Sequence, residues 1–326
     1  MAGMLDGKVA IVTGAGRGLG RDEALLLAKH GAKIIVNDVG LGIGQASKGA
    51  ETELTDTSTR PADEVVKEIK DMGGEAAPNY ESVTDFEGAK RIIDQAIDTF
   101  GKLDILVNNA GILRDKMVFN MEEGEFDAVI AVHLKGTFNC TRHATNYWRA
   151  ESKAGKPVAG RIINTASDAG LLYNAGQSNY GAAKAGIVSF TLIVAKEVSR
   201  YGVTANVVLP VARTRLTTEG TPSLAPMMGN KEDFEKKYGY DVLGPEMMAP
   251  LVVYLASDDA ADVTGQVIRV VGGNLWILHS WRSSDVSKRD PPGMWEPKEI
   301  GPKLKELIAK QPEREELAGI IMGVLS

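Results

Sequence analysis

Tyr180 and Lys184 stand four residues apart in a segment whose length and composition predict a helix. Side chains at this spacing lie on one face of a helix, so the ammonium group would lie near the phenol. Free tyrosine has a pKa of about 10, which is too high for a base at neutral pH. A neighbouring positive charge favours the phenolate and lowers that pKa, so Tyr180 is a candidate base for removing a proton from an alcohol.

Ser167 is a second candidate catalytic group, because it ends a predicted strand shortly before Tyr180 in the chain. Its hydroxyl could hydrogen-bond a substrate oxygen and stabilise the charge that develops there. Taken alone, both features have ordinary interpretations. A tyrosine and a lysine at this spacing are usually a core residue and a surface residue, and a serine at a strand end is usually a cap. The surrounding motifs must therefore decide between these interpretations.

A glycine-rich loop follows the first predicted strand and leads into a helix. Its glycines permit a tight turn and let backbone N–H groups approach a pyrophosphate, which the helix N-terminus stabilises. The second predicted strand ends in Asp38, whose carboxylate would accept hydrogen bonds from the adenosine ribose and repel a 2′-phosphate. This pattern predicts a dinucleotide site that prefers NAD to NADP, although Arg17 could instead pair with a 2′-phosphate. The predicted loop contacts are Gly14, Gly16, Arg17, Gly18, Leu19 and Gly20.

Short runs rich in β-branched residues alternate with longer segments of helical periodicity. The predicted strands are residues 8–13, 33–38, 75–80, 103–108, 161–166, 203–209 and 266–271. The predicted helices are residues 19–30, 61–72, 85–100, 122–150, 179–201 and 245–257. This alternation predicts an α/β protein with a doubly wound Rossmann fold and a seven-stranded parallel sheet. Ligands of such folds bind at the carboxyl ends of the strands, where the candidate residues stand.

Two segments fall outside the alternation of predicted strands and helices. Residues 39–60 are polar and too long for an ordinary connection, so we expect a flexible insertion after the second strand. Residues 274–326 form a C-terminal extension beyond the predicted Rossmann-fold domain at residues 1–273.

The extension contains three of the four tryptophans, Trp276, Trp281 and Trp295. Large aromatic side chains stabilise a protein when they are buried, so we expect the first half to pack on the core domain or on a neighbouring subunit. Near the end, residues 303–317 are predicted to form a helix that Pro312 interrupts.

The composition excludes several classes of protein. The chain has 326 residues, a formal charge of −6 and one cysteine, Cys140. A net negative charge argues against a nucleic-acid binder, and one cysteine allows neither an intramolecular disulfide nor a multi-cysteine metal site. No apolar run approaches the roughly 20 residues that span a membrane, and the first residues do not resemble a secretory signal. We therefore expect a cytoplasmic protein.

Asn108-Asn109-Ala110-Gly111 follows the fourth predicted strand. With the glycine loop and the Tyr180–Lys184 pair, it resembles the short-chain dehydrogenase/reductase family over about residues 5–273. The resemblance implies catalysis by Ser167, Tyr180 and Lys184, with Tyr180 and Lys184 also contacting the cofactor. It also implies cofactor contacts from Ser82, Val83, Asn109, Ala110, Gly111, Pro210, Val211 and Thr214. Val211 departs from the glycine that the family usually has there.

His133 stands where the family usually has an asparagine. In the family the main-chain carbonyl at this position holds a water that leads to the lysine, so a histidine could serve in the same proton relay. The ordinary alternative is a buried histidine, because His133 shares a helical stripe with Phe126, Ile130 and Thr137. No second histidine or carboxylate stands at a suitable spacing, so we predict no metal site.

Further segments resemble one subgroup, the (3R)-hydroxyacyl-CoA dehydrogenase part of peroxisomal multifunctional enzymes and its bacterial single-domain relatives. These segments are residues 36–38, 79–83, 108–115, 132–136 and 176–180. The resemblance implies NAD-dependent interconversion of 3-hydroxyacyl-CoA and 3-oxoacyl-CoA, with Tyr180 as acid and base. The alternatives are an NADPH-dependent 3-oxoacyl-[acyl-carrier protein] reductase, a hydroxysteroid dehydrogenase and a protein that only binds the dinucleotide.

We expect the acyl thioester or steroid substrate to contact residues 113–117, 171–177 and 214–240, with the last segment acting as a lid. The two long predicted helices at residues 122–150 and 179–201 pack between subunits in related enzymes. The resemblance therefore implies a homodimer or homotetramer.

Overall fold

The computed structural model describes residues 3–40, 60–218, 225–279, 294, 296–312 and 315–325. Their strands form one sheet in the order β3-β2-β1-β4-β5-β6-β7-β8. All neighbouring strands from β3 to β7 are parallel, whereas β8 runs antiparallel to β7. The strands are β1 Val9–Thr13, β2 Lys33–Asn37, β3 Ala76–Asn79, β4 Ile105–Asn108, β5 Gly160–Thr165, β6 Val203–Val211, β7 Val267–Val271 and β8 Asn274–Ile277.

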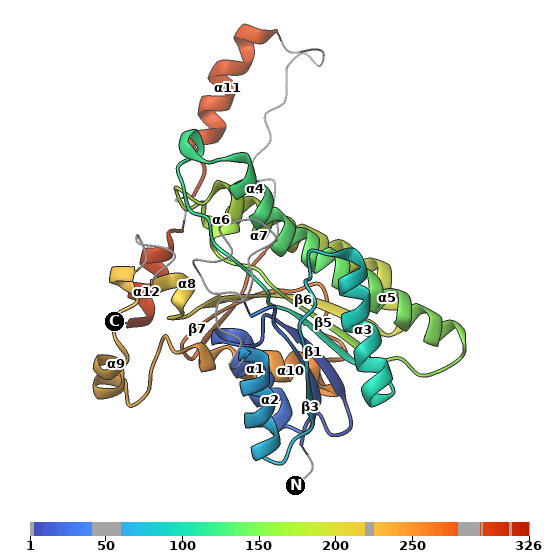
Figure 1. Cartoon of the computed structure of the whole chain (residues 1–326). Coiled ribbons are helices and arrows are strands. Elements are labelled where there is room, and N and C mark those ends of the chain that lie inside the picture. The colour runs from blue at the N-terminus through green and yellow to red at the C-terminus, as the bar shows by residue number, and fades with distance from the viewer. Residues whose placement is uncertain are drawn as a thin grey trace.

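Helices cover both faces of the sheet, with α1, α2 and α10 on one face and α3, α5 and α7 on the other (Figure 1). This arrangement confirms the doubly wound prediction. The described helices are α1 Gly18–Lys29, α2 Pro61–Asp71, α3 Phe86–Phe100, α4 Glu123–Ile130, α5 Gly136–Lys153, α6 Ala169–Leu172, α7 Ser178–Val198, α8 Arg215–Thr218, α9 Lys231–Tyr238, α10 Ala249–Ala256, α11 Pro297–Ala309 and α12 Leu317–Leu325.

The central strands are buried on both faces because successive side chains point to opposite sides of the sheet. Ile11 of β1 belongs to the core on the α3 and α5 side, and the next residue, Val12, belongs to the core on the α1 and α10 side. The register places Val12 beside Val36 on one neighbouring strand and Val107 on the other. The continuous apolar runs in the sequence therefore correspond to strands that are enclosed by helices.

The predicted total of seven strands is wrong, because an eighth strand continues the sheet beyond β7. The Gly272-Gly273 turn reverses the chain, and Trp276 of β8 pairs opposite Arg269 of β7. Trp276 is half-buried there, and residues 274–277 at the beginning of the extension pair with the edge of the sheet. Trp281 and Trp295 lie outside the described residues, as do residues 41–59 of the predicted insertion.

The predicted terminal helix at residues 303–317 is also wrong in its bounds. A capping box formed by Glu296 and Glu299, with Pro297 in the first turn, starts α11 earlier in the chain. The helix ends at Ala309, before Pro312, and α12 is a separate apolar helix. Figure 1 shows α11 projecting from the body of the protein, whereas α12 lies against it.

The predicted helix at residues 122–150 consists of three consecutive parts. After α4, residues Ala131–Lys135 form a π-helical turn, and α5 follows without a break. The predicted helix at residues 179–201 is α7, which ends in a 3₁₀ turn at Ser199–Tyr201. The sequence did not predict the short helices α6, α8 and α9, which lie in the connections around the carboxyl edge of the sheet.

Glu23 is an anomaly in the core, because its side chain on α1 is 0% exposed. Neither carboxylate oxygen has a hydrogen-bond partner among the described residues. Burial, assisted by the negative charge of Asp22, raises the pKa of Glu23 to about 8. The folded protein therefore keeps this carboxyl group protonated at neutral pH.

Glu23→Gln tests this protonation state. Between pH 4.5 and about 8 the carboxyl group is ionised in the unfolded chain but protonated in the folded protein. Stability contributed by this group therefore falls as pH rises through that window, by at most about 1.4 kcal/mol per pH unit. Urea unfolding should show the variant gaining stability relative to the wild type from pH 5 to pH 8. A pH-independent difference, or the same trend in the exposed control Glu64→Gln, would contradict the assignment.

Candidate active site

The loop after β1 and the turn after β4 are tied together at the carboxyl edge of the sheet. The Thr13 hydroxyl accepts hydrogen bonds from the backbone N–H groups of Asn109 (3.0 Å) and Ala110 (3.1 Å). The Asn109 side-chain amide donates to the carbonyls of Thr13 (3.1 Å) and Gly14 (3.2 Å). A Cβ at Gly14 would lie 2.8 Å from the Ala110 Cα, so the close approach requires glycine. Two predicted nucleotide-binding segments are thus brought together.

Asp38 lies over the glycine loop. Its carboxylate accepts hydrogen bonds from the backbone N–H groups of Gly16 (3.0 Å) and Gly40 (2.7 Å). A Cβ at Gly16 would lie 2.7 Å from one carboxylate oxygen, so this contact also depends on glycine. On the other side of the loop, the Thr214 side chain lies closest to Gly18. The structure therefore places residues from the ends of β1, β2 and β6 around one loop.

This loop fits the pyrophosphate of a dinucleotide. No side chain caps the N-terminus of α1, where Arg17 precedes the helix, so the first N–H groups of the helix remain available to an anion. Ser82 and Val83 follow β3 at the same edge of the sheet, as predicted. The Val83 carbonyl accepts a hydrogen bond from Asn139 on α5 (2.9 Å), which fixes that segment.

Ser167, Tyr180 and Lys184 line a single cavity beside this loop. Tyr180 hydrogen-bonds Ser167, and the Lys184 ammonium lies 5.5 Å from the centroid of the Tyr180 ring. Lys184 Nζ also donates to the Thr165 carbonyl at the end of β5 (2.6 Å). The Asn179 side chain accepts from the Tyr180 backbone N–H (2.7 Å). The three predicted catalytic side chains are therefore held together by β5 and the first turns of α7.

Burial makes the uncharged form of both titratable residues more favourable. It lowers the pKa of Lys184 to about 7 and raises the pKa of Tyr180 to about 12. The hydrogen bond with Ser167 acts in the opposite direction on Tyr180, but burial dominates. The free protein therefore holds a neutral phenol, and additional positive charge is needed to make Tyr180 a base at neutral pH.

His133 lies in the π-helical turn and connects the turn after β4 to Tyr180. Its Nε2 atom lies 2.8 Å from the carbonyl oxygen of Ile112 and 3.0 Å from the backbone nitrogen of the same residue. The ring meets Tyr180 edge-on, with 5.1 Å between centroids. A Cβ at Gly111 would lie 2.4 Å from the imidazole, so glycine is required for this packing.

Burial and the charge of Lys184 lower the pKa of His133 to about 3. The imidazole is therefore neutral at physiological pH, with a proton on one ring nitrogen only, and its ring positions neighbouring groups without adding a positive charge. Its Nδ1 atom has no hydrogen-bond partner among the described residues. π-Helical turns are frequent at functional sites, which agrees with the position of His133 in the cavity wall.

The cavity combines many of the predicted residues with others that the sequence did not single out. The predicted site residues that line it are Leu19, Asn109, Gly111, His133, Ser167, Tyr180, Lys184, Pro210, Val211 and Thr214. Leu113, Asn174, Gln177 and Met228 come from the segments expected to contact the substrate. Val211 remains part of β6, so the strand continues where the family usually has glycine.

The remaining predicted cofactor residues do not line this cavity. They belong to the glycine loop, the end of β2, the segment after β3 and the turn after β4. These residues are Gly14, Gly16, Arg17, Gly18, Gly20, Asp38, Ser82, Val83 and Ala110. Thr217 also comes from a segment expected to contact the substrate, whereas the sequence analysis missed Asp168 and Leu317, which line the cavity as well. Leu317 begins α12, and no local spacing links that helix to the catalytic residues.

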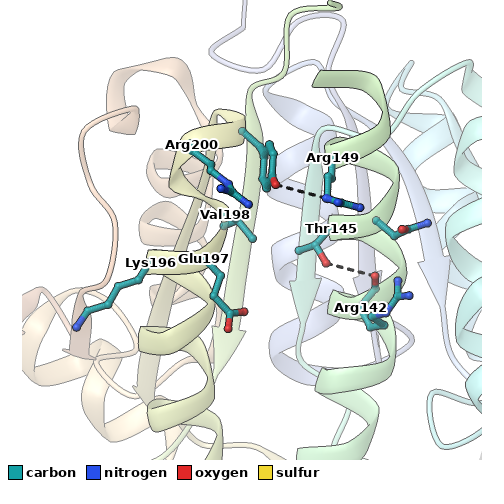
Figure 2. A pocket seen from close by; sticks show the side chains of 9 residues that line it. Arg142, Thr145, Arg149, Lys196, Glu197, Val198 and Arg200 are labelled. Atoms are coloured by element: carbon teal, nitrogen blue, oxygen red, sulfur yellow. Dashed lines mark hydrogen bonds between the residues drawn. The ribbon is translucent and has the colours of Figure 1, made fainter. Parts of the chain in front are cut away.

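A second hollow lies between α5 and α7, away from the catalytic side chains. Figure 2 shows Arg142 and Arg149 on α5 across from Glu197 on α7 and Arg200 in the turn that follows it, whereas the Lys196 side chain points away from α5. None of the predicted site residues lines it. The predicted catalytic residues therefore all lie in the other cavity, around Tyr180.

Within the described part of the chain, no group of three or more His, Cys, Asp or Glu residues could hold a metal ion. The helices described here include none that is both long and apolar enough to cross a membrane.

Comparison with known proteins identifies the family. Residues 40–223 match the family model described as short chain dehydrogenase. The chain belongs to that family. It is 42% identical to hydroxyacyl-CoA dehydrogenase ChsB1 of Mycobacterium tuberculosis over 95% of this chain and 92% of that protein. It is also 42% identical to peroxisomal multifunctional enzyme type 2 of Drosophila melanogaster, covering 85% of this chain and 41% of the longer enzyme.

The fold is similar to the crystal structure of a short chain dehydrogenase from Mycobacterium avium. That comparison has a TM-score of 0.81 at 44% identity and covers 96% of this chain and 98% of the other. Membership of the family makes the protein an oxidoreductase that uses a nicotinamide cofactor. The glycine loop and the open N-terminus of α1 fit such a cofactor.

Lys184→Met tests whether burial controls the charge of the active-site amine. Between about pH 7 and pH 10.5 the amine is neutral in the folded protein but charged in the unfolded chain. The wild type should therefore gain stability relative to the variant as pH rises, by at most about 1.4 kcal/mol per pH unit. Urea unfolding of the cofactor-free protein from pH 6.5 to pH 9.5 measures this difference. A flat difference would show that Lys184 keeps its ordinary pKa.

Proposed function

We propose that the protein is an NAD-dependent dehydrogenase that interconverts 3-hydroxyacyl-CoA and 3-oxoacyl-CoA thioesters in β-oxidation of lipids or steroid side chains. The observation that carries the proposal is the complete Ser167–Tyr180–Lys184 cavity in a chain so similar to a hydroxyacyl-CoA dehydrogenase along nearly its full length. A protein that only binds the dinucleotide would need no proton acceptor, so the intact cavity favours catalysis.

In the oxidation direction, the Ser167 hydroxyl hydrogen-bonds the substrate oxygen and Tyr180 removes the proton from the substrate hydroxyl. Lys184 favours the phenolate when it carries a proton, and its hydrogen bond to Thr165 fixes its place beneath the ring. A bound oxidised nicotinamide would supply the acceptor for the hydride that leaves the substrate carbon, together with a positive charge. In the reverse direction Tyr180 returns the proton to the oxygen.

The residues that would hold the cofactor lie at the carboxyl edge of the sheet, around the loop after β1 and the turn after β4. The glycine loop would bind the pyrophosphate, and Asp38 would bind the adenosine ribose. Ser82, Val83 and the turn containing Asn109 would border the adenosine. Lys184 would bind the nicotinamide ribose, and Thr214 would bind the nicotinamide amide.

His133 would support this arrangement in two ways. Its imidazole holds Ile112, which continues the turn that borders the cofactor, and packs against Tyr180. Its main-chain carbonyl would hold the water that leads to Lys184, as in the family. We therefore propose a relay through the backbone of His133, with the neutral ring acting as a positioning group.

Tyr180→Phe tests the mechanism, because phenylalanine keeps the ring but has no proton to exchange. Reduction of acetoacetyl-CoA, followed as loss of NADH absorbance, should fall by at least about 10³-fold. NADH binding, measured by fluorescence, should change by less than about twofold. Turnover near the wild-type rate would exclude Tyr180 as the acid and base.

Asp38→Ala tests cofactor preference. Removing the carboxylate removes the repulsion of a 2′-phosphate, and the exposed Arg17 then becomes available to pair with it. The ratio of kcat/KM for NADPH to that for NADH should rise by at least about tenfold. An unchanged ratio would show that Asp38 does not select the cofactor. A wild type that already prefers NADPH would favour the acyl-carrier protein reductase alternative.

We also propose a homodimer or homotetramer in the cytoplasm. The long helices α5 and α7 expose the cationic hollow of Figure 2 together with Phe138 and Ile193, which are large apolar side chains. Such a face is suited to a subunit interface.

The buried free thiol of Cys140 agrees with a reducing compartment such as the cytoplasm, and cell fractionation would test this location.

Light scattering at micromolar concentration should give twice or four times the mass of one chain, which is 34.8 kDa. Ile193→Glu places a charge on the proposed interface and should shift the population towards single chains. A wild-type mass of one chain would contradict the assembly.

A further inference from the structure

A buried ion pair connects Asp168, the residue after Ser167, to β7, which lies two strands away from β5 in the sheet. Asp168 is 2% exposed, and Arg269 of β7 is 3% exposed. Arg269 Nε donates to both carboxylate oxygens, at 2.9 and 3.1 Å, and Nη2 lies 2.8 Å from one of them. A buried pair of this kind adds little stability compared with well-packed apolar residues, but loss of one partner is strongly unfavourable.

Asp168 belongs to the same tight turn as Ser167. The Asp168 carbonyl accepts hydrogen bonds from the backbone N–H groups of Leu171 (2.9 Å) and Leu172 (2.6 Å), and so begins α6. The Ser167 hydroxyl accepts from the Ala169 backbone N–H (3.2 Å). A displacement of the Asp168 side chain would therefore move the backbone that places the Ser167 hydroxyl.

Arg269 is itself held by the sheet. Its neighbours in the strand register are Leu209 on β6 and Trp276 on β8. Its Nη1 atom also contacts Glu315, which precedes α12 and is 65% exposed (3.2 Å). The guanidinium therefore makes one buried contact towards the catalytic turn and one exposed contact towards the C-terminal segment.

The pair also controls charge in the cavity, because Asp168 lines the same cavity as Ser167 and Tyr180. Burial raises the pKa of Asp168 and the Arg269 guanidinium opposes that shift. Without Arg269 the carboxyl group would either take up a proton or, as a carboxylate, oppose the negative charge that develops on Tyr180 and on the substrate oxygen. Arg269 compensates for that charge from a buried position where water screens little. The Arg269 guanidinium thus affects both the position of the Ser167 hydroxyl and the charge of the neighbouring Asp168.

We propose that Arg269 is a positioning residue that acts through Asp168 to hold the Ser167 hydroxyl and to neutralise the charge beside it. The catalytic effect rests on the proposed function, whereas the effect on the turn does not. Misplacement of a catalytic group by about 1 Å can reduce a rate by about 100-fold.

Four variants test the proposal. Arg269→Met leaves the buried carboxylate unpaired and should lower kcat for acetoacetyl-CoA by at least about tenfold, with KM for NADH within about twofold. Adding Asp168→Asn to this variant replaces the unpaired carboxyl group by an amide and should restore part of kcat. Arg269→Lys keeps a positive charge near Asp168 and should retain an intermediate rate. Glu315→Gln is the matched control, because it removes only the exposed contact, and should keep the wild-type rate.

Hydrogen exchange followed by mass spectrometry provides a readout that needs no substrate. Arg269→Met should increase exchange in peptides covering residues 166–173 and leave those covering β1 and α1 unchanged. Unchanged kcat and unchanged exchange would overturn the proposal. Loss of protection throughout the protein would also overturn it, because the role would then be general stability. A wild type inactive on acyl-CoA would contradict the proposed function, while the exchange result would still test the pair.

Discussion

The site depends on the parallel pairing of β1 with both β2 and β4. This pairing places the reversal of strand order at β1, so the chain leaves β1 towards one face and leaves β4 towards the other. The loops therefore separate and leave a crevice at the carboxyl edge of the sheet. Thr13 and Asn109 join the bases of these two loops. The predicted cofactor contacts in the glycine loop and in the turn after β4 are held in position by these hydrogen bonds.

Burial then determines the chemistry available in the crevice. Burial removes Lys184, Tyr180 and His133 from water and so favours the neutral form of all three side chains. The free protein is therefore organised for catalysis but lacks the charge that makes Tyr180 basic. Cofactor binding and activation of the base are coupled in this account, because an oxidised nicotinamide would add positive charge to the part that a protonated Lys184 supplies beside Tyr180.

The sequence predicted features whose signals are local. The glycine loop, Asp38, Ser167 and the Tyr180–Lys184 pair are recognised from short spacings at the ends of strands, and the cavity contains the predicted catalytic residues. The number of strands was predicted incorrectly because β8 was not recognised. This strand is short and partly polar, and it follows a glycine turn. Its pairing is determined by the exposed edge of β7 rather than by its own periodicity.

Other features could not be predicted because they join distant positions. Asp168 and Arg269 are 101 residues apart in the chain, and neither belongs to a spacing that suggests an ion pair. Leu317 reaches the cavity only because α12 packs with Met228, Leu243 and Val271 in a small apolar core. Such contacts depend on how the C-terminal segment folds onto the sheet.

The most direct test of this account follows absorbance at 340 nm with purified protein, acetoacetyl-CoA, and NADH or NADPH in parallel. The account predicts rapid oxidation of NADH and little oxidation of NADPH. Preference for NADPH would contradict the assignment of Asp38 and favour a reductase. No reaction with either cofactor would contradict the acyl-CoA substrate and direct attention to steroid alcohols.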